Sequence, residues 1–541
     1  IKLDGNYPTG TGNVALGDTA LDSISTGASN TAIGADALTS NTSASNNTAV
    51  GYQSLYANTT GAENTSVGDA SLDANTTGSY NTALGRNALT SNTTASFNTA
   101  IGRLSLFLNV TGTNNTAVGS GSLQSNTASN NTAVGSNALV SNTTASNNTA
   151  VGYQAGDALI NGAENVAIGS GALSAEVAGD NTVAVGKDAL RVQQTNSNLD
   201  MHNVAIGHSS GYSDTSGRFN TFVGSQSGYS NTTASSNTAF GFQSLYSNTT
   251  GGDNTGSGVK ALFANTTGTL NVSVGSSSMR DNTTGSYNTS LGVNTLRFNT
   301  TASNNTAVGY HSLYSNTAAS GSTAVGISAG YSQNTTGDAF NAFFGLQSGY
   351  SVTTGTKNTF IGGVNSGYSV TTGSNNTILG NYTGNQGGLD IRTSSNNIVL
   401  SDGVGNPRVH IDSNGRLIVG NSIGTDTWPQ ATSTADEQKI QLQQTAQLDI
   451  STNQSGAIRV NINNGNGFPA YWYRNGTFVG SISVSSSATA YNTTSDYRLK
   501  ENVVDMTGAI ERVKQLSPKR FNFIADSDTT VDGFLAHEAQ T

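Results

Sequence analysis

A five-residue motif that returns every 17 residues constrains the fold of this chain more than any other feature. The motif, Asn-Thr-Ala-(Val/Ile/Leu)-Gly, steps by 17 residues from Asn13 to Asn115. It slips by one residue at Asn131, is disturbed around Asn181, and runs again from Asn203 to Ser322. Looser copies follow, and they begin at Asn341, Asn358, Asn376 and Asn397. A fixed period of this length is typical of solenoids.

The full repeat reads N-T-A-V-G-x-x-S-L-x-x-N-T-T-G-S-x, and we number its positions 1 to 17 from the first Asn. Asn, Thr, Ser and Gly are poor helix formers, which excludes a helical repeat. Positions 2 and 4 lie on one face of a short strand. We expect that face and the Leu at position 9 to form the core, and the small residue at position 3 to point away.

One such unit cannot bury a core, whereas stacked units can, because each passes its backbone hydrogen bonds to the next. The sequence therefore predicts an all-β fold, a repetitive parallel β-solenoid or β-roll over 13–383. About 22 coils, stacked roughly 4.8 Å apart, would give a rod on the order of 100 Å long.

Regular polar rows on a solenoid also suggest two binding functions, one for ice through Thr and one for Ca²⁺ through Asn. The calcium repeat GGxGxDxUx is absent, and neutral Asn side chains are weak ligands for a hard cation. Thr at position 2 alternates with Val, as at Val166 and Val204, which suggests an inward site. We therefore interpret the rows as structural.

Composition narrows the function further. The net charge of −10 and the absence of Lys/Arg clusters argue against a nucleic-acid partner. No apolar run approaches the roughly 18–20 residues that span a bilayer, so no membrane insertion is expected. There is no cysteine, and the histidines show no metal-ligand spacing; they are His202, His208, His311, His410 and His537. The sequence thus predicts neither a metal site nor a cofactor.

The repeats resemble the head repeats of trimeric autotransporter adhesins, and similar repeats occur in phage tail fibres. The resemblance rests on NTAVG and NTAIG over most of the first 380 residues. It implies a left-handed β-roll that assembles as a homotrimer.

After the repeats, the chain reads as β-hairpins. Turn signals at Asp402-Gly403 and Asn414-Gly415 fall in a β-hairpin region, 384–425, and a connector and β-rich distal region follows over 426–494. Asn475-Gly476 predicts another hairpin there. Its aromatic run, Tyr471 to Tyr473, either stacks on a sugar or, as we favour, packs the hairpin. Residues 1–12 form an N-terminal lead-in.

Charged residues concentrate after Thr494. The motifs SDYRLKEN at 495–502, MTGAIERVKQLSPKRFNFI at 506–524 and GFLAHE at 533–538 resemble the start of the intramolecular chaperone domain of phage tailspikes and fibres, the S74 peptidase family. The resemblance implies that 495–541 is part of a longer domain that guides trimerisation and then releases itself. It implies cleavage at Thr494–Ser495, with Ser495 as nucleophile and Lys500 as base. We expect this segment to be a small α+β unit with a helix capped by Thr507.

The two resemblances therefore imply a phage tail-fibre shaft in the extracellular virion that presents a host-attachment end. Its partners would be itself in a homotrimer, other tail proteins, and a host cell-surface receptor, for which a glycan is one candidate. It would be no enzyme beyond one round of autoproteolysis. The alternative is a bacterial trimeric surface adhesin, which should carry a signal peptide and a membrane-anchoring barrel that this sequence does not display. A polysaccharide-degrading fibre would need a carboxylate pair, and the repeats contain few acids.

Overall fold

The structure is a computed structural model, and it describes residues 10–415, 417–419, 467–474, 477–484, 489–493, 504–523 and 526–533. The chain divides into two compact units, residues 1–438 and 439–541. We describe each unit by itself.

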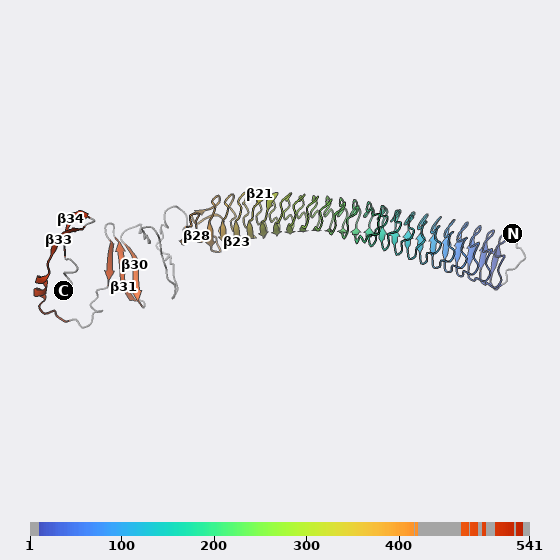
Figure 1. The fold of residues 1–541 in the computed structure, drawn as a ribbon, viewed down its shortest axis with the longest axis horizontal. Coiled ribbons are helices and arrows are strands. Elements are labelled where there is room, and N and C mark those ends of the chain that lie inside the picture. Colours follow the sequence, from blue (N-terminus) through green and yellow to red (C-terminus); the bar gives the residue numbers. More distant parts are fainter. Residues whose placement is uncertain are drawn as a thin grey trace. The chain divides into compact units, whose positions relative to one another are not determined.

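The first unit is a parallel β-solenoid in which nearly every coil contributes one three-residue strand to a continuous sheet (Figure 1). The sheet holds 25 strands, and all of them except β28 and β29 pair in parallel with strands of neighbouring coils. The all-β solenoid predicted from the 17-residue period is thus confirmed. The parallel strands are β1 (Val14–Leu16), β2 (Thr31–Ile33), β3 (Thr48–Val50), β4 (Thr65–Val67), β5 (Thr82–Leu84), β6 (Thr99–Ile101), β7 (Thr116–Val118), β8 (Thr132–Val134), β9 (Thr149–Val151), β10 (Val166–Ile168), β11 (Val183–Val185), β12 (Val204–Ile206), β13 (Thr221–Val223), β14 (Thr238–Phe240), β15 (Thr255–Ser257), β16 (Val272–Val274), β17 (Thr289–Leu291), β18 (Thr306–Val308), β20 (Thr323–Val325), β22 (Ala342–Leu346), β23 (Thr359–Val364), β24 (Thr377–Leu379) and β27 (Ile398–Ser401).

Equal repeat positions face each other from coil to coil. Ala32 of β2 pairs with Ala49 of β3, and this register holds through the slip at Asn131 and the insert after Asn181. The residue missing before Asn131 and the extra residues after Asn181 therefore fall outside the paired strands and do not displace their rows.

The solenoid sheet ends in antiparallel pairing. β27 pairs with β28 (Pro407–Ile411), and β28 pairs with β29 (Leu417–Val419), so the two turn signals lie between paired strands. Two short ladders sit beside the main sheet: β19 (Ala318–Ser320) with β21 (Thr336–Asp338), and β25 (Asn385–Gln386) with β26 (Leu389–Asp390).

The second unit contains β30 (Gly467–Arg474), β31 (Thr477–Val484) and β32 (Thr489–Thr493), which pair antiparallel in sequence order. Asn475-Gly476 lies between β30 and β31, as its hairpin signal predicts. A second antiparallel pair joins β33 (Lys519–Phe523) to β34 (Asp526–Gly533). The helix α1 spans Ala509–Gln515, but its cap is Gly508 with φ 73° and no side-chain hydrogen bond, so the prediction of Thr507 as cap is wrong.

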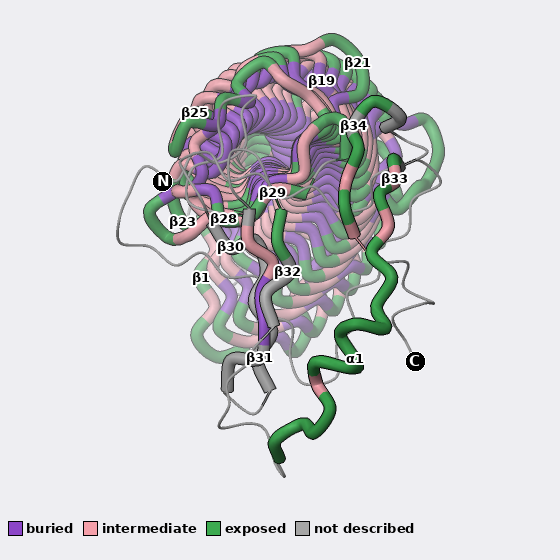
Figure 2. The backbone as a smooth tube through the Cα atoms, turned by 90° about the vertical axis from the view of Figure 1, so that its left-hand side faces the viewer, coloured by how far each residue is buried: buried purple, intermediate pink, exposed green. Residues whose placement is uncertain are grey.

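In most coils the solenoid core consists of one small and one large side chain, and the side of the strand that faces inward is the opposite of the predicted one. Position 3 is buried, as at Ala32 and Ala150, whereas positions 2 and 4 face outward. Leu at position 9 is buried as expected, for example at Leu89 and Leu245. Figure 2 shows buried residues along the inside of the coils. The interior is narrow, so Ala fits opposite Leu where Val would not.

Three coils use a different pair that fills the same space. Phe222, Phe343 and Phe360 occupy position 3 and are buried, and these coils carry Gly in place of the core Leu. A Cβ added at Gly228 would lie 2.6 Å from the Phe222 ring. Gly211 of the preceding coil lies on the other side of the same ring, and a Cβ added there would be 2.9 Å from Phe222. A buried Phe at position 3 is therefore accommodated by glycines at position 9 of its own coil and of the preceding coil.

This complementarity predicts strong coupling between Phe222 and Gly228. Phe222→Ala should lower the free energy of unfolding by about 3–5 kcal/mol through the cavity it leaves, and Gly228→Leu should destabilise by steric clash. The double variant recreates the Ala-Leu pair of the next coil and should lose clearly less than the sum of the single losses, with the remaining loss due to the space beside Gly211 that Phe222 also fills. Urea unfolding of the four proteins measures this; a double variant that loses the sum of the single losses contradicts it.

Candidate assembly face and chaperone segment

The residues that the resemblance assigns to autoproteolysis lie outside the described residues. This holds for Ser495, for Lys500 and for the Thr494–Ser495 bond, so their roles stay predictions. The aromatic run Tyr471 to Tyr473 lies on β30, where the backbone alone is described.

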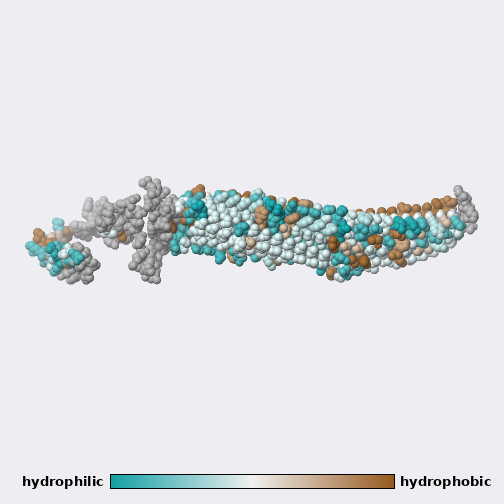
Figure 3. All heavy atoms as spheres, turned by 90° about the horizontal axis from the view of Figure 1, so that it is seen from above, coloured by the Kyte–Doolittle hydropathy of each residue, from teal (hydrophilic) through white to brown (hydrophobic). Residues whose placement is uncertain are grey.

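The most extensive functional candidate in the first unit is a row of exposed apolar side chains at position 4. The row follows the sheet from coil to coil, and Figure 3 shows part of it as a brown line along one edge of the N-terminal half. Leu291 is 49% exposed and Leu379 is 52% exposed. Other exposed members are Leu16, Ile33, Leu84, Val134, Val151, Ile168, Ile206, Phe240, Phe344, Ile361 and Leu400.

The row carries no charge anywhere along the solenoid. Position 2 is Thr, Val, Ala or Ile in every coil, and position 4 is aliphatic, Phe or Ser. Burying such a row costs no ion desolvation, and each buried side chain gains about 1.5–3 kcal/mol relative to an exposed one. A contiguous exposed apolar row of this kind marks an interaction surface. The sequence-based prediction placed these residues in the core. The absence of charged residues from positions 2 and 4 is visible in the sequence, but it fits a buried row as well as an interface.

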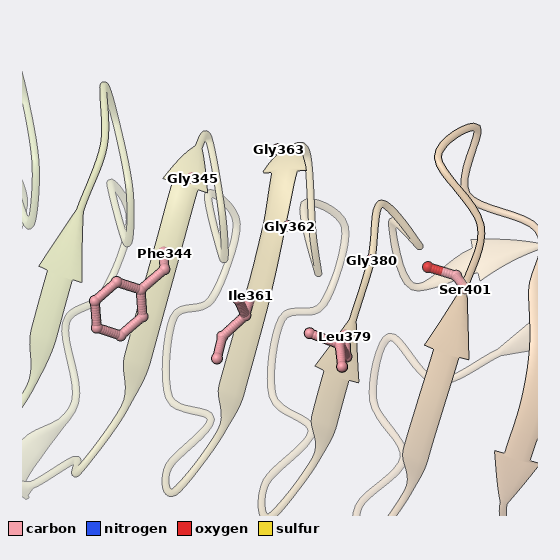
Figure 4. Close-up of a pocket in the computed structure, with 8 residues that line it drawn as sticks. All are labelled: Phe344, Gly345, Ile361, Gly362, Gly363, Leu379, Gly380 and Ser401. Carbon is pink, nitrogen blue, oxygen red and sulfur yellow. The ribbon is translucent and has the colours of Figure 1, made fainter.

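The row is hollowed near its C-terminal end. Phe344, Ile361 and Leu379 line the hollow with their side chains, and Gly345 and Gly363 line it with backbone alone (Figure 4). β23 carries one extra residue there, so that Val364 pairs with Leu346. The hollow is therefore part of the apolar face and not a separate polar site.

Aromatic rings at position 10 form two ladders along another edge of the coils. Their ring centroids are 5.1 Å apart from Tyr229 to Tyr246 and 4.9 Å apart from Tyr331 to Tyr350, with nearly parallel planes. Each stacked pair contributes about 0.5–1.5 kcal/mol. Because the rings cover one another's faces, the ladders stabilise the stack of coils and do not offer a sugar-stacking platform. Their members are Tyr212, Tyr229, Tyr246 and Phe263, and Tyr314, Tyr331, Tyr350 and Tyr368.

Inside the coils, asparagine side chains satisfy the buried polar groups. At position 1, the Asn64 backbone amide donates to Asn47 Oδ1 (2.9 Å). At position 12, Asn75 Nδ2 donates to Asn58 Oδ1 (2.8 Å) and to the Gly78 carbonyl (2.9 Å). These ladders are buried and structural, which agrees with our interpretation of the Asn rows.

Two carboxylates interrupt the position 12 ladder near the middle of the solenoid. Glu176 Oε1 accepts the hydroxyl of Thr195 (2.7 Å) and the amide of Gly179 (2.8 Å), and its Oε2 accepts Gln193 Nε2 (2.9 Å). Asp214 is also buried, and Asn231 Nδ2 donates to its Oδ2 (3.0 Å). Burial raises the pKa of Asp214 to about 8; its hydrogen bonds oppose this, and the charge of Glu176 adds to it.

Other site chemistry is scarce in the part of the chain that the structure describes. Within it, no group of three His, Cys, Asp or Glu side chains could hold a metal ion. His410 is buried and its Nε2 lies 3.0 Å from Asn397 Oδ1, far along the chain from His202 and His311. Nor does any helix among the described residues have the length and apolarity to cross a membrane.

The described part of residues 495–541 exposes apolar side chains. Ile510 and Val513 lie on α1 and are exposed, as are Val504 and Met506 before it. Arg520 of β33 pairs with Asp532 of β34 (2.6 Å), and this ion pair lowers the pKa of Asp532.

Comparison with known proteins gives one family match. A family model for the chaperone of endosialidase, peptidase S74, matches residues 495–541. No curated protein matches the chain. No solved structure matches it either. The family match and the β-solenoid body fit a phage tail fibre with a C-terminal chaperone domain, as the two resemblances implied.

Asp214 makes the stability of the solenoid depend on pH. Its carboxyl is protonated in the folded chain up to about pH 8, but ionises near pH 4 when unfolded, so the free energy of unfolding falls as pH rises between these values. Asp214→Asn removes the carboxyl that titrates and restores the Asn that occupies position 12 in most coils. We expect the variant to exceed the parent by more than about 1 kcal/mol at pH 9 and to match it near pH 4.

Urea unfolding across this pH range measures the effect. Asp253→Asn, which removes a carboxylate from an exposed position, is the control and should keep the slope of the parent. Parallel pH profiles for the parent and Asp214→Asn would show that Asp214 is not the group that titrates.

Proposed function

We propose that this protein is the shaft of a phage tail fibre, extends from the virion and presents a host-attachment end. The chain is a structural fibre with a C-terminal chaperone segment, and the observation that carries the phage assignment is the family match over 495–541 at the end of a solenoid body. The alternative, a bacterial trimeric adhesin, accounts for the repeats but not for the chaperone match.

The position 4 row supports assembly into a homotrimer. A partner that covers this row must present apolar groups at the same coil spacing over the same length. A second copy of the chain does so, and the uncharged row avoids repulsion between copies of a protein with a net charge of −10. Three rolls that bury their rows against one another leave the polar faces in water.

The stacked coils suit a spacer between the phage and its host. Each coil bonds to its neighbours through the backbone, so the solenoid resists bending and stretching without a large core. Other tail proteins would hold one end, and a receptor on the host surface, including glycans, would meet the other.

The chaperone segment would release itself after folding by cleavage at Thr494–Ser495. Ser495 Oγ attacks the Thr494 carbonyl carbon while Lys500 takes the hydroxyl proton. The carbon–nitrogen bond then breaks, the proton passes to the leaving amine of Ser495, and water hydrolyses the resulting ester. Lys500 must be neutral to act, so burial has to lower its pKa from about 10.4.

Self-release predicts two masses. Protein expressed from the complete gene should give a chain that ends at Thr494, whereas Ser495→Ala should stay uncut, because no nucleophile remains. Lys500→Met should also stay uncut, and Ser517→Ala, which alters an exposed serine in the same segment, should cut normally. Intact mass under denaturing conditions measures this, and equal full-length masses for the parent and Ser495→Ala would refute self-release.

The proposed assembly predicts a native mass of three chains. Sedimentation equilibrium or native mass spectrometry at micromolar concentration should give three times the chain mass of 55.1 kDa, or of the cleaved chain if release has occurred. A native mass of one chain would rule out the homotrimer.

A further inference from the structure

The residue at position 6, two residues beyond the apolar row, changes character along the solenoid. From β14 to β23 this position is exposed and mostly apolar: Val293 is 44% exposed and Ile327 is 52% exposed. The other members are Phe242, Val259, Ser276, Tyr310, Leu346 and Val364.

The same position is largely polar in the preceding coils. Asp69 and Arg86 occupy it in neighbouring coils and form an ion pair of 3.4 Å. The remaining occupants are Asp18, Ala35, Tyr52, Arg103, Ser120, Ser136, Tyr153, Ser170, Lys187, His208 and Ser225. Positions 2 and 4 do not change in this way, so of these three outward positions only position 6 differs between the two parts of the solenoid.

We propose that the strip from Phe240 to Val364, formed by positions 4 and 6, is the zone in which copies of this chain hold one another most tightly. The inference rests on the proposed homotrimer and states where along the shaft its contact is broadest. In the N-terminal coils position 4 is apolar, but position 6 beside it is mostly polar and carries several charges. In the strip both positions are uncharged and mostly apolar, so copies bury about twice as many apolar side chains per coil.

A second copy is the occupant that fits this strip. The strip continues the row proposed to hold the trimer, has the same coil spacing, and contains no charge at either position. Its C-terminal end contains the hollow between Phe344, Ile361 and Leu379, where glycines leave room for side chains of a partner. An unrelated protein or a membrane does not present apolar groups at the spacing of the coils.

The test compares equal charge insertions inside and outside the strip of the full chain. Val293→Asp with Ile327→Asp places two carboxylates in the strip, and Ser120→Asp with Ser136→Asp places two at position 6 outside it. All four sites are exposed, so the solenoid itself does not require their side chains. We expect the strip variant to raise the dissociation constant of the trimer at least 100-fold, and the outer variant to change it less than 10-fold.

Sedimentation equilibrium gives the dissociation constants, and circular dichroism confirms that each variant keeps its strands. If the strip variant does not fold, Val293→Ser with Ile327→Ser replaces it. This pair places at position 6 the same residue that Ser120 and Ser136 already place there outside the strip, and it should also weaken the trimer. Equal effects of the inner and outer pairs on a trimeric parent overturn the strip proposal and leave the homotrimer standing. A monomeric parent overturns both.

Discussion

Hydrogen bonds between adjacent coils are the constraint on which the rest of this structure depends. The amide of Thr48 donates to the carbonyl of Asn64 in the next coil (2.8 Å), and the amide of Gly51 donates to Ile33 in the preceding one (2.8 Å). Each coil buries backbone N–H and C=O groups, and these must be hydrogen-bonded. A three-residue strand cannot pair with itself, so the partners lie in the neighbouring coils. The two buried Asn ladders complete this pattern where the backbone alone cannot. The strict period follows, because a coil of the wrong length would break the ladders on both of its sides.

Stacking in register turns every repeat position into a row, so one residue type decides the property of a whole surface. Position 4 becomes an apolar face, position 10 becomes an aromatic ladder in two stretches of four coils, and position 12 becomes a buried polar column in most coils. Stacking also makes the interior a series of similar layers. Where position 3 is Ala, Leu at position 9 fills the layer, and where position 9 is Gly, as at Gly228, a Phe such as Phe222 can fill it. Exceptions such as Asp214 are therefore informative, because each interrupts a column whose other members show what the position requires.

The period and the strand propensity were sufficient to predict the solenoid, its register and the buried Leu. They did not predict which face of a three-residue strand points inward. Hydrophobicity favoured Val50 over Ala49, but the interior between coils is too narrow for a branched side chain opposite Leu55. The position of Asp214 could have been found by aligning the repeats, since Asn fills that position in most coils, whereas its pKa needed the burial that only the structure gives. Ser495 and Lys500 stay predictions, since they lie outside the described residues.

In the proposed homotrimer, the uniformity that makes the shaft simple would leave the alignment of the copies poorly specified. If two copies met only through position 4, a shift by one coil would exchange one aliphatic contact for another and lose only the overlap of a single coil. The free energy of that shifted pairing would be close to that of the correct one, so the row cannot fix the register by itself. Features that do not repeat must do so: the insert after Asn181, the aromatic and aliphatic residues at position 6, and a folding segment at the end of the chain. A chaperone attached to so regular a fibre is thus most useful for alignment, because the regular coils already carry the information for their own fold.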